Sequence, residues 1–271
     1  MPVDVAALCD DLERETAALD ALLAPLPPAD WDRPTPAERW AIRDQVSHLA
    51  WFDESTITAL TDAARFQREL TEALADPDGI TGRVTKRYRD VDAAELLGWF
   101  RDARARMIAI FRATDPSTRV PWYGPDMAVA SSVTARIMET WAHGQDVADA
   151  LGVTRSPTPA LRHVAHLGVR TLPNSFRSRD LPVPDEPVRV ELVGPDGEPW
   201  MWGDDAAANR VRGSALDFCL VVTQRRHLAD TDLEVHGPVA TRWLSIAQAF
   251  AGPTGPGRQP GQFRARQHAD G

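Results

Sequence analysis

The sequence predicts a helical bundle followed by a smaller domain of mixed α+β structure. Apolar residues recur at helical spacing through the first two-thirds of the chain, in four segments separated by polar or proline-rich links. The pattern then changes to short alternating runs and glycine-containing turns. We expect an antiparallel four-helix bundle over 1–155, an α+β domain over 156–252 and a disordered tail over 253–271.

Four long helices are expected in the bundle. Their apolar residues lie three and four positions apart, and each segment ends at a break that contains proline or glycine. Gly152 follows the fourth segment, where a left-handed residue often closes a helix. The segment Asp76-Pro77-Asp78-Gly79 is expected to stop the second. The expected helices are Val5–Leu23, Trp40–Ala75, Ala93–Ala113 and Ala128–Leu151.

The rest of the chain predicts short strands and further helices. The run Val188–Val193 alternates apolar and polar residues, and the turn Gly194–Gly197 predicts a hairpin to a strand at Pro199–Trp202. Further strands are expected at Asn209–Arg212 and Asp232–His236, and helices at Pro159–Leu172, Ala215–Gln224 and Val239–Phe250.

Composition excludes several classes of protein. Hydrophobic residues make up 43% of the 271, enough to bury a substantial core. No stretch is apolar for long enough to span a bilayer, and the first residues lack the features of a secretory signal. A net charge of −9 argues against a nucleic-acid partner, because phosphate contacts need clustered cations. Cys9 and Cys219 form no CxxC pair, so we expect a reducing, cytoplasmic setting.

The chemistry is expected on the fourth helix, at Glu139 and His143. Residues four apart on a helix are offset by only about 40° around its axis, which suits two ligands of one metal ion. Asp146 falls on the same stripe. The neighbouring Met138 and Ala142 are apolar, which favours burial of this stripe over a solvated face. The ExxxH spacing alone is a weak signal, and a polar stripe that faces water stays an alternative.

A third ligand has to come from another helix, and His48 is the best candidate. It shares a mostly apolar stripe with Ala41, Phe52 and Ala59. A lone histidine on such a stripe is either a satisfied core residue or a ligand. Imidazole and carboxylate ligands together suit zinc and its neighbours in the first-row series, so the predicted metal is a divalent ion, with zinc first.

Two segments carry a resemblance to a known family. Trp40–Trp51 and Glu139–Asp146 together resemble the DinB/YfiT-like metal-binding bundle, and more closely the N-terminal domain of mycothiol-dependent maleylpyruvate isomerases. In that family a four-helix bundle binds zinc through a histidine on the second helix and a Glu-x-x-x-His pair on the fourth. The resemblance therefore implies that His48, Glu139 and His143 are the metal ligands.

The second domain resembles the C-terminal domain of the same family more loosely. There an arginine that follows a buried helix reaches the active site, and the run Leu220–Arg226 ends in the matching place. Either Arg225 or Arg226 is the equivalent, because Gln224 stands where the family more often has glycine. The alternative for both is a surface cation at a helix C-terminus. Gly213–His227 also resembles a domain of wybutosine-forming tRNA enzymes, an interpretation that the net charge of −9 disfavours.

The predicted function is a metal-dependent thiol transferase or thiol-assisted isomerase. Three protein ligands leave a tetrahedral zinc with an open position, where a bound thiol loses its proton near neutral pH. The resemblance implies that the thiol is mycothiol, the sugar-linked cysteine of actinobacteria. The substrate is then a small electrophile or carboxylate, held by Arg225 or Arg226. Asp146 is expected to orient a ligand or to transfer a proton.

Two other functions stay open. A hydrolase would use the same metal to activate water and would turn over without a thiol. A non-catalytic protein would bind only the metal or a small molecule, and a coordination sphere completed by Asp146 would favour it. No membrane partner is expected. The sequence selects no oligomeric state, and a homodimer stays among the alternatives.

Overall fold

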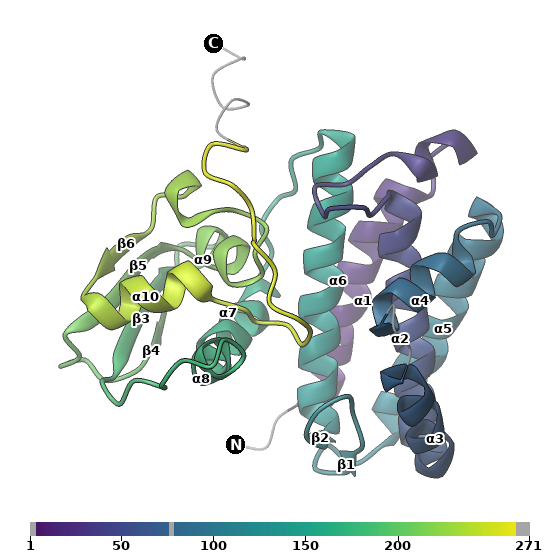
Figure 1. Ribbon diagram of the computed structural model, residues 1–271, viewed down its shortest axis with the longest axis horizontal. Helices are drawn as coiled ribbons and strands as arrows, with labels where there is room; N and C mark the ends of the chain where they lie inside the picture. Colours follow the sequence, from purple (N-terminus) through teal and green to yellow (C-terminus); the bar gives the residue numbers. More distant parts are fainter. Residues whose placement is uncertain (1–3, 76–78, 264–271) are drawn as a thin grey trace. The chain divides into compact units, whose positions relative to one another are not determined.

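The computed structural model describes residues 4–75 and 79–263, and the chain divides into two compact units, Met1–Arg155 and Ser156–Gly271 (Figure 1). The first unit is almost entirely helical, and the second combines helices with a four-stranded sheet. The predicted fold class, a helical bundle followed by a smaller α+β domain, is confirmed. Among the described residues, no helix is long and apolar enough to cross a membrane.

Four long helices form the body of the first unit. They are α1 (Val5–Leu23), α2 (Ile42–Thr61), α5 (Ala93–Ala113) and α6 (Val129–Leu151). α2 packs against α5 and α6, and α1 packs against the same two helices. The predicted bounds of α1 and α5 are confirmed, and α6 starts one residue later than predicted. Shorter elements are η1 (Pro28–Asp32), α3 (Ala63–Leu74), α4 (Gly79–Tyr88), β1 (Arg119–Val120) and β2 (Met127–Ala128).

The prediction of one helix from Trp40 to Ala75 was wrong, because the helix is interrupted at Asp62. This residue has φ −148° and ψ 78°, and its carboxylate accepts the backbone N–H of Arg65 at 2.9 Å. That bond caps α3 as a new helix. No proline or glycine marks the break, so the usual stop signals give no warning of it. Residues 76–78 of the predicted stop lie outside the described residues.

The helix α6 is buried around most of its circumference. Met138, Ala142 and Val147 are 2%, 1% and 0% exposed, as their apolar character predicted. Polar side chains of α6 that lie between such residues therefore face other parts of the protein and have to find partners there. This burial is what turns the stripe of Glu139 and His143 into an internal site.

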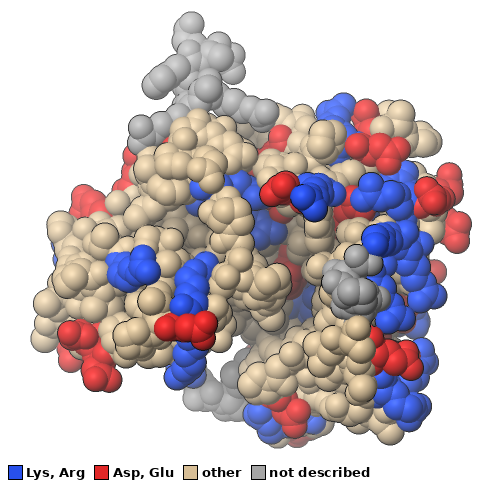
Figure 2. Space-filling model, in the orientation of Figure 1, with Lys and Arg blue, Asp and Glu red and all other residues tan. Residues whose placement is uncertain are grey.

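The surface of the first unit carries both signs of charge. Figure 2 shows basic and acidic side chains interspersed over its helices on the face drawn. Several of them pair across helices, for example Arg101 of α5 with Asp20 of α1 at 2.7 Å, and Arg112 of α5 with Asp10 of α1 at 2.7 Å. Such exposed pairs contribute little to stability.

The second unit is built around a four-stranded sheet in the order β4-β3-β5-β6. The strands are β3 (Val188–Val193), β4 (Pro199–Trp202), β5 (Asn209–Ser214) and β6 (Glu234–His236). β3 runs parallel to β5, and the other neighbouring pairs are antiparallel. Val190, Leu192 and Val211 are buried, as the alternation of apolar residues predicted.

The helices of the second unit are α7 (Leu161–Arg170), α8 (Leu172–Arg177), α9 (Ala215–Val222) and α10 (Pro238–Ile246), with the 3-10 helix η2 (Leu228–Asp230). α7 packs on α9, and α10 packs on α8 and β5. α10 ends at Ile246 and not at the predicted Phe250. From 253 to 263 the chain forms no helix or strand. The rest of the predicted disordered tail, 264–271, lies outside the described residues.

Candidate metal centre

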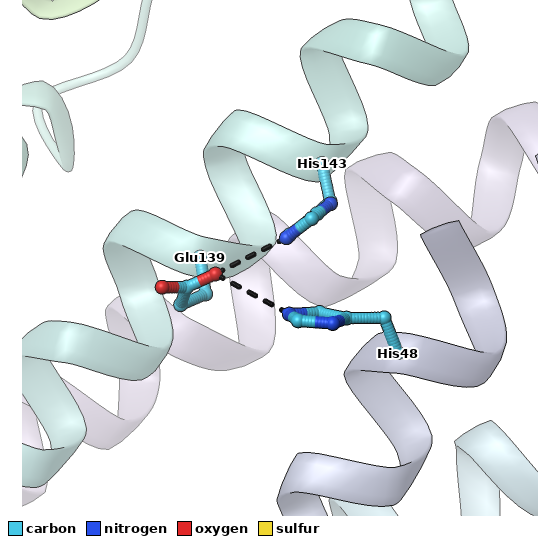
Figure 3. Close-up of side chains that lie close together, drawn as sticks. All are labelled: His48, Glu139 and His143. Carbon is cyan, nitrogen blue, oxygen red and sulfur yellow. Dashed lines mark hydrogen bonds and ion pairs between the residues drawn. The ribbon is translucent and has the colours of Figure 1, made fainter. Parts of the chain in front are cut away.

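The structure brings three of the predicted site residues together inside the first unit. His48 lies on α2, and Glu139 and His143 lie one turn apart on α6, which packs against α2. One ligand atom from each residue lies within 4.8 Å of the others. Figure 3 shows both imidazoles directed at the carboxylate of Glu139. We call these three residues the histidine–glutamate cluster.

The distances within the cluster are short. Glu139 Oε2 lies 3.1 Å from Nε2 of His143 and 3.7 Å from Nε2 of His48. The side chains of His48 and His143 are 11% and 9% exposed, whereas that of Glu139 is 19% exposed. The two imidazoles are thus buried, and the carboxylate retains the largest share of contact with solvent.

Burial and mutual contact set the charges of the cluster. Burial, reinforced by the neighbouring His143, lowers the pKa of His48 to about 4, so this imidazole is neutral near pH 7. Burial alone would raise the pKa of Glu139, but its close contacts with the imidazoles of His143 and His48 outweigh that effect and hold the pKa well below its usual range. Metal binding requires an ionised carboxylate and neutral imidazoles. The ionised Glu139 and the neutral His48 are already in that form.

A fourth side chain, Gln45, contacts the cluster from α2. Its Oε1 lies 2.5 Å from Nδ1 of His143, and its Nε2 donates to Oγ1 of Thr35 at 2.9 Å. Gln45 precedes His48 by three positions and therefore lies on the same side of the helix. Sequence reasoning missed this residue, although its i, i+3 spacing to a candidate ligand was a signal that could have found it.

Aromatic rings pack on both histidines. Trp40 stacks on His143, with ring centroids 5.8 Å apart and an interplanar angle of 14°, and its ring lies 5.3 Å from that of His48. Phe52 lies 4.6 Å from His48 on the next turn of α2. These rings limit the orientations of the imidazoles and keep water from their faces.

A second buried polar group lies on the same helices. Asp53 of α2 accepts hydrogen bonds from Arg104 of α5 at 2.7 Å and from Arg136 of α6 at 3.2 Å. Arg104 also donates to Thr16 at 2.6 Å and to Thr140 at 2.9 Å. We call Asp53, Arg104 and Arg136 the arginine–aspartate cluster. Sequence reasoning missed it as well, because its three members come from three different helices.

The remaining candidate site residues lie outside the histidine–glutamate cluster. Asp146 is 0% exposed on α6 and is not among the three converging ligands. Arg225 and Arg226 follow α9 in the second unit. Arg225 is buried and donates through Nη1 to the carbonyl of Thr223 at 2.6 Å, and the guanidinium of Arg226 lies 3.7 Å from the ring centroid of Phe263. The roles of these three residues stay predictions.

Gln224, which precedes the two arginines, adopts a left-handed backbone conformation. Its φ is 59°, a value that glycine adopts without strain and other residues rarely adopt. A hydrogen bond offsets part of this backbone strain, because Nε2 of the side chain donates to the carbonyl of Ala247 at 3.0 Å. The glycine that the resemblance leads one to expect at this position therefore has a physical reason.

The fold and the cluster together define a helical-bundle protein with a candidate metal centre. A family model described as the mycothiol maleylpyruvate isomerase N-terminal domain matches residues 12–148, which contain the whole cluster. The chain belongs to this family, and the resemblance seen in its sequence is confirmed. A second model, described as wyosine base formation, matches residues 184–235 in the second unit.

Similar proteins include both sequences and solved structures. Two relatives, each called an uncharacterized protein of Mycobacterium tuberculosis (strains CDC 1551 / Oshkosh and ATCC 25618 / H37Rv), are 50% identical over 248 residues, 92% of this chain and 96% of theirs. The crystal structure of the mycothiol-dependent maleylpyruvate isomerase has a TM-score of 0.59 at 15% identity, over 83% of this chain and 90% of that one. A histidine-to-alanine mutant of that enzyme gives the same values. This likeness shows a shared fold.

Proposed function

We propose that the protein is a zinc-dependent thiol transferase or thiol-assisted isomerase that uses mycothiol. The observation that carries the proposal is the convergence of His48 Nε2 and His143 Nε2 on one oxygen of Glu139, inside a bundle of the mycothiol maleylpyruvate isomerase family. Two imidazoles and one carboxylate are the ligand set of many catalytic zinc sites.

The distances fit a zinc ion. Zinc bonds of about 2.0–2.1 Å to nitrogen and oxygen place neighbouring ligand atoms of a tetrahedron roughly 3.3–3.4 Å apart. The separations of 3.1 and 3.7 Å between Glu139 and the two histidines lie on either side of this value. Small side-chain rotations would therefore suffice to bind the ion, and these three residues would hold it.

The chain contains no thiol of its own that could serve as the nucleophile. Cys9 and Cys219 are both free and buried. Burial raises the pKa of each thiol, so neither forms a thiolate readily. Neither belongs to the histidine–glutamate cluster. A thiol reaction at this site requires a thiol from solution, which supports the use of a small co-substrate such as mycothiol.

A divalent cation in this cluster would leave one coordination position open and would lower the pKa of a thiol that occupies it. The surrounding residues prepare the site for that chemistry. Trp40 and Phe52 cover the imidazoles, which strengthens electrostatic interactions there. For the substrate we propose the roles that the family resemblance implies: Arg225 or Arg226 binds its carboxylate, and Asp146 orients a ligand or transfers a proton.

Metal content and thiol binding test this proposal. The native protein, His48→Ala and the control His236→Ala, which changes an exposed histidine of the second unit, are purified and analysed by elemental mass spectrometry. Each is then titrated with mycothiol, and X-ray absorption at the metal edge reports whether sulfur enters the coordination sphere. We expect one zinc per native and control chain, its loss in His48→Ala, and a sulfur ligand on addition of thiol.

Other outcomes would point to the alternatives. Stoichiometric zinc that never acquires a sulfur ligand would contradict thiol chemistry and favour either hydrolysis by bound water or a structural metal. Turnover of an ester or amide without thiol would then select the hydrolase. The absence of metal from all three proteins, even after reconstitution, would overturn the proposal.

A further inference from the structure

The direction of the Gln45 amide is fixed by a chain of hydrogen bonds. The hydroxyl of Thr35 donates its only hydrogen to the carbonyl of Trp40 at 2.9 Å. Its oxygen can therefore only accept from Gln45, at 2.9 Å. The atom of Gln45 that faces Thr35 must be the amide nitrogen. The backbone N–H of Thr35 also donates to the carbonyl of Trp40, at 2.8 Å, which holds this loop in place.

The orientation of the amide determines the tautomer of His143. With its nitrogen turned to Thr35, Gln45 presents its oxygen to Nδ1 of His143, 2.5 Å away. An amide oxygen only accepts hydrogen bonds, so Nδ1 has to carry the hydrogen. In the neutral ring the lone pair then lies on Nε2, the nitrogen that is directed at Glu139 (Figure 3).

This tautomer places two acceptors opposite each other. Nε2 of His143 with its lone pair lies 3.1 Å from a carboxylate oxygen of Glu139. Without a partner the ring would lower its energy by moving the hydrogen to Nε2 and donating it to Glu139. Gln45 opposes that change, because it would lose its own hydrogen bond and leave a buried amide oxygen unsatisfied. The arrangement favours a cation between the two acceptors.

The second histidine has no comparable support. Nδ1 of His48 is buried and has no hydrogen-bond partner among the residues that the structure describes. Its ring packs against the rings of Trp40, Phe52 and His143. The two histidine ligands are therefore unequal: one is fixed by a hydrogen bond before any metal arrives, and the other is not.

We propose that Gln45 is a positioning residue, oriented by Thr35, that commits His143 to the Nδ1–H tautomer and so keeps Nε2 available for the metal. The inference rests on the proposed function in one respect, namely that the cluster binds a metal. Its prediction about the tautomer does not depend on that. Supporting hydrogen bonds of this kind typically change metal affinity by about 10–100-fold.

Three variants separate positioning from a merely structural role. Gln45→Met keeps the length of the side chain and removes the acceptor. Gln45→Glu keeps an acceptor for Nδ1. The matched control is Gln145→Met, which alters a buried glutamine of α6 whose amide donates to Asp149 and not to the cluster. Zinc affinity is measured by competition with a chelator, and nitrogen-15 NMR of histidine-labelled, metal-free protein reports which ring nitrogen of His143 carries hydrogen.

We expect hydrogen on Nδ1 of His143 in the wild type and its transfer to Nε2 in Gln45→Met, with zinc binding weakened about 10–100-fold. Gln45→Glu should retain the wild-type tautomer and restore affinity, and Gln145→Met should match the wild type in both measurements. Hydrogen absent from Nδ1 in the wild type, or a tautomer unchanged in Gln45→Met, would overturn the inference.

The same experiment distinguishes this inference from the proposed function. If the wild type binds no zinc, the proposed function fails, but the NMR measurement still decides the role of Gln45. If the wild type binds zinc and Gln45→Met binds it equally well, the inference fails and the proposed function stands. Thermal unfolding of the metal-free variants shows whether any loss of affinity reflects a loss of folded protein.

Discussion

The helices α2 and α6 carry two buried polar groups that differ in one respect. In the arginine–aspartate cluster every contact joins a donor to an acceptor, as in the 2.7 Å bond from Arg104 to Asp53. In the histidine–glutamate cluster, the tautomer inferred for His143 makes two acceptors face each other, with His143 Nε2 3.1 Å from Glu139 Oε2. Both groups are buried in the same bundle and lie within one or two turns of each other along these helices.

The difference distinguishes a structural group from a binding site. Buried charges are tolerated when they satisfy each other, and a cluster that does so needs nothing further. A cluster of acceptors is satisfied only when a cation joins it. The first group should therefore contribute to stability and not to metal binding, and the second should do the reverse. The predictions that follow test this separation.

The largest effect on stability is expected from Asp53→Ala. Removing this carboxylate leaves Arg104 and Arg136 buried without their charged partner, which typically costs about 3–5 kcal/mol. Urea denaturation of the metal-free protein measures the change. The control Asp20→Ala breaks the exposed pair with Arg101 and should cost at most about 1 kcal/mol. Equal losses in the two variants would show that the arginine–aspartate cluster is not a structural group of the kind described.

The opposite behaviour is expected for Glu139→Gln. The new amide nitrogen can donate to Nε2 of His143, so the variant should be as stable as the metal-free wild type or up to about 1 kcal/mol more stable. Zinc binding should weaken by more than about 100-fold, because loss of a ligand costs more than loss of a supporting hydrogen bond. Denaturation and chelator competition measure the two quantities. A marked loss of stability without loss of zinc binding would reverse the assignment of the two clusters.

Added zinc should stabilise the wild type and leave Glu139→Gln unchanged. An ion that binds only the folded state at 100 times its dissociation constant stabilises it by about 2.7 kcal/mol. Thermal unfolding at increasing zinc concentration measures this shift. Asp53→Ala should be stabilised by zinc to the same extent, although its metal-free form is less stable, because its metal ligands are intact. An increment that disappears in Asp53→Ala would mean that the two clusters are coupled.

The sequence predicted the long helices and the residues that converge, because both follow from the period of a single helix. The range Ala93–Ala113 is confirmed, and the i, i+4 spacing placed Glu139 and His143 on one side of α6. The break at Asp62 was not predictable in this way, since it depends on one capping bond to Arg65 and on packing beyond it.

The supporting residues escaped sequence reasoning for a different reason. Gln45 reaches His143 across the interface of two helices, and its role depends on the orientation that Thr35 gives it. The pairing of Asp53 with Arg104 and Arg136 joins residues 51 and 83 positions apart. Such contacts are set by how helices pack, and no local pattern encodes them. The choice between Arg225 and Arg226 could not be predicted from the sequence, because both lie on a loop, where helix periodicity gives no guide.

The smallest effect on stability is expected from Thr140→Val. This variant tests whether the two clusters act separately, even at adjacent residues of α6. Thr140 follows Glu139 directly in the sequence, yet its hydroxyl accepts from Arg104 at 2.9 Å and donates to the carbonyl of Arg136 at 2.7 Å. The substitution keeps the shape and removes the hydroxyl as both acceptor and donor, while Thr16 and Asp53 still satisfy the guanidinium of Arg104. We expect a loss of about 1 kcal/mol in urea denaturation.

Zinc affinity should not change in Thr140→Val, because consecutive residues of α6 point about 100° apart and serve different clusters. Chelator competition beside the wild type measures it. A loss of affinity comparable to that of Gln45→Met would mean that the arginine–aspartate cluster also positions the ligands. The two buried groups would then form one network, in which the surplus positive charge of the paired arginines acts on the carboxylate of Glu139.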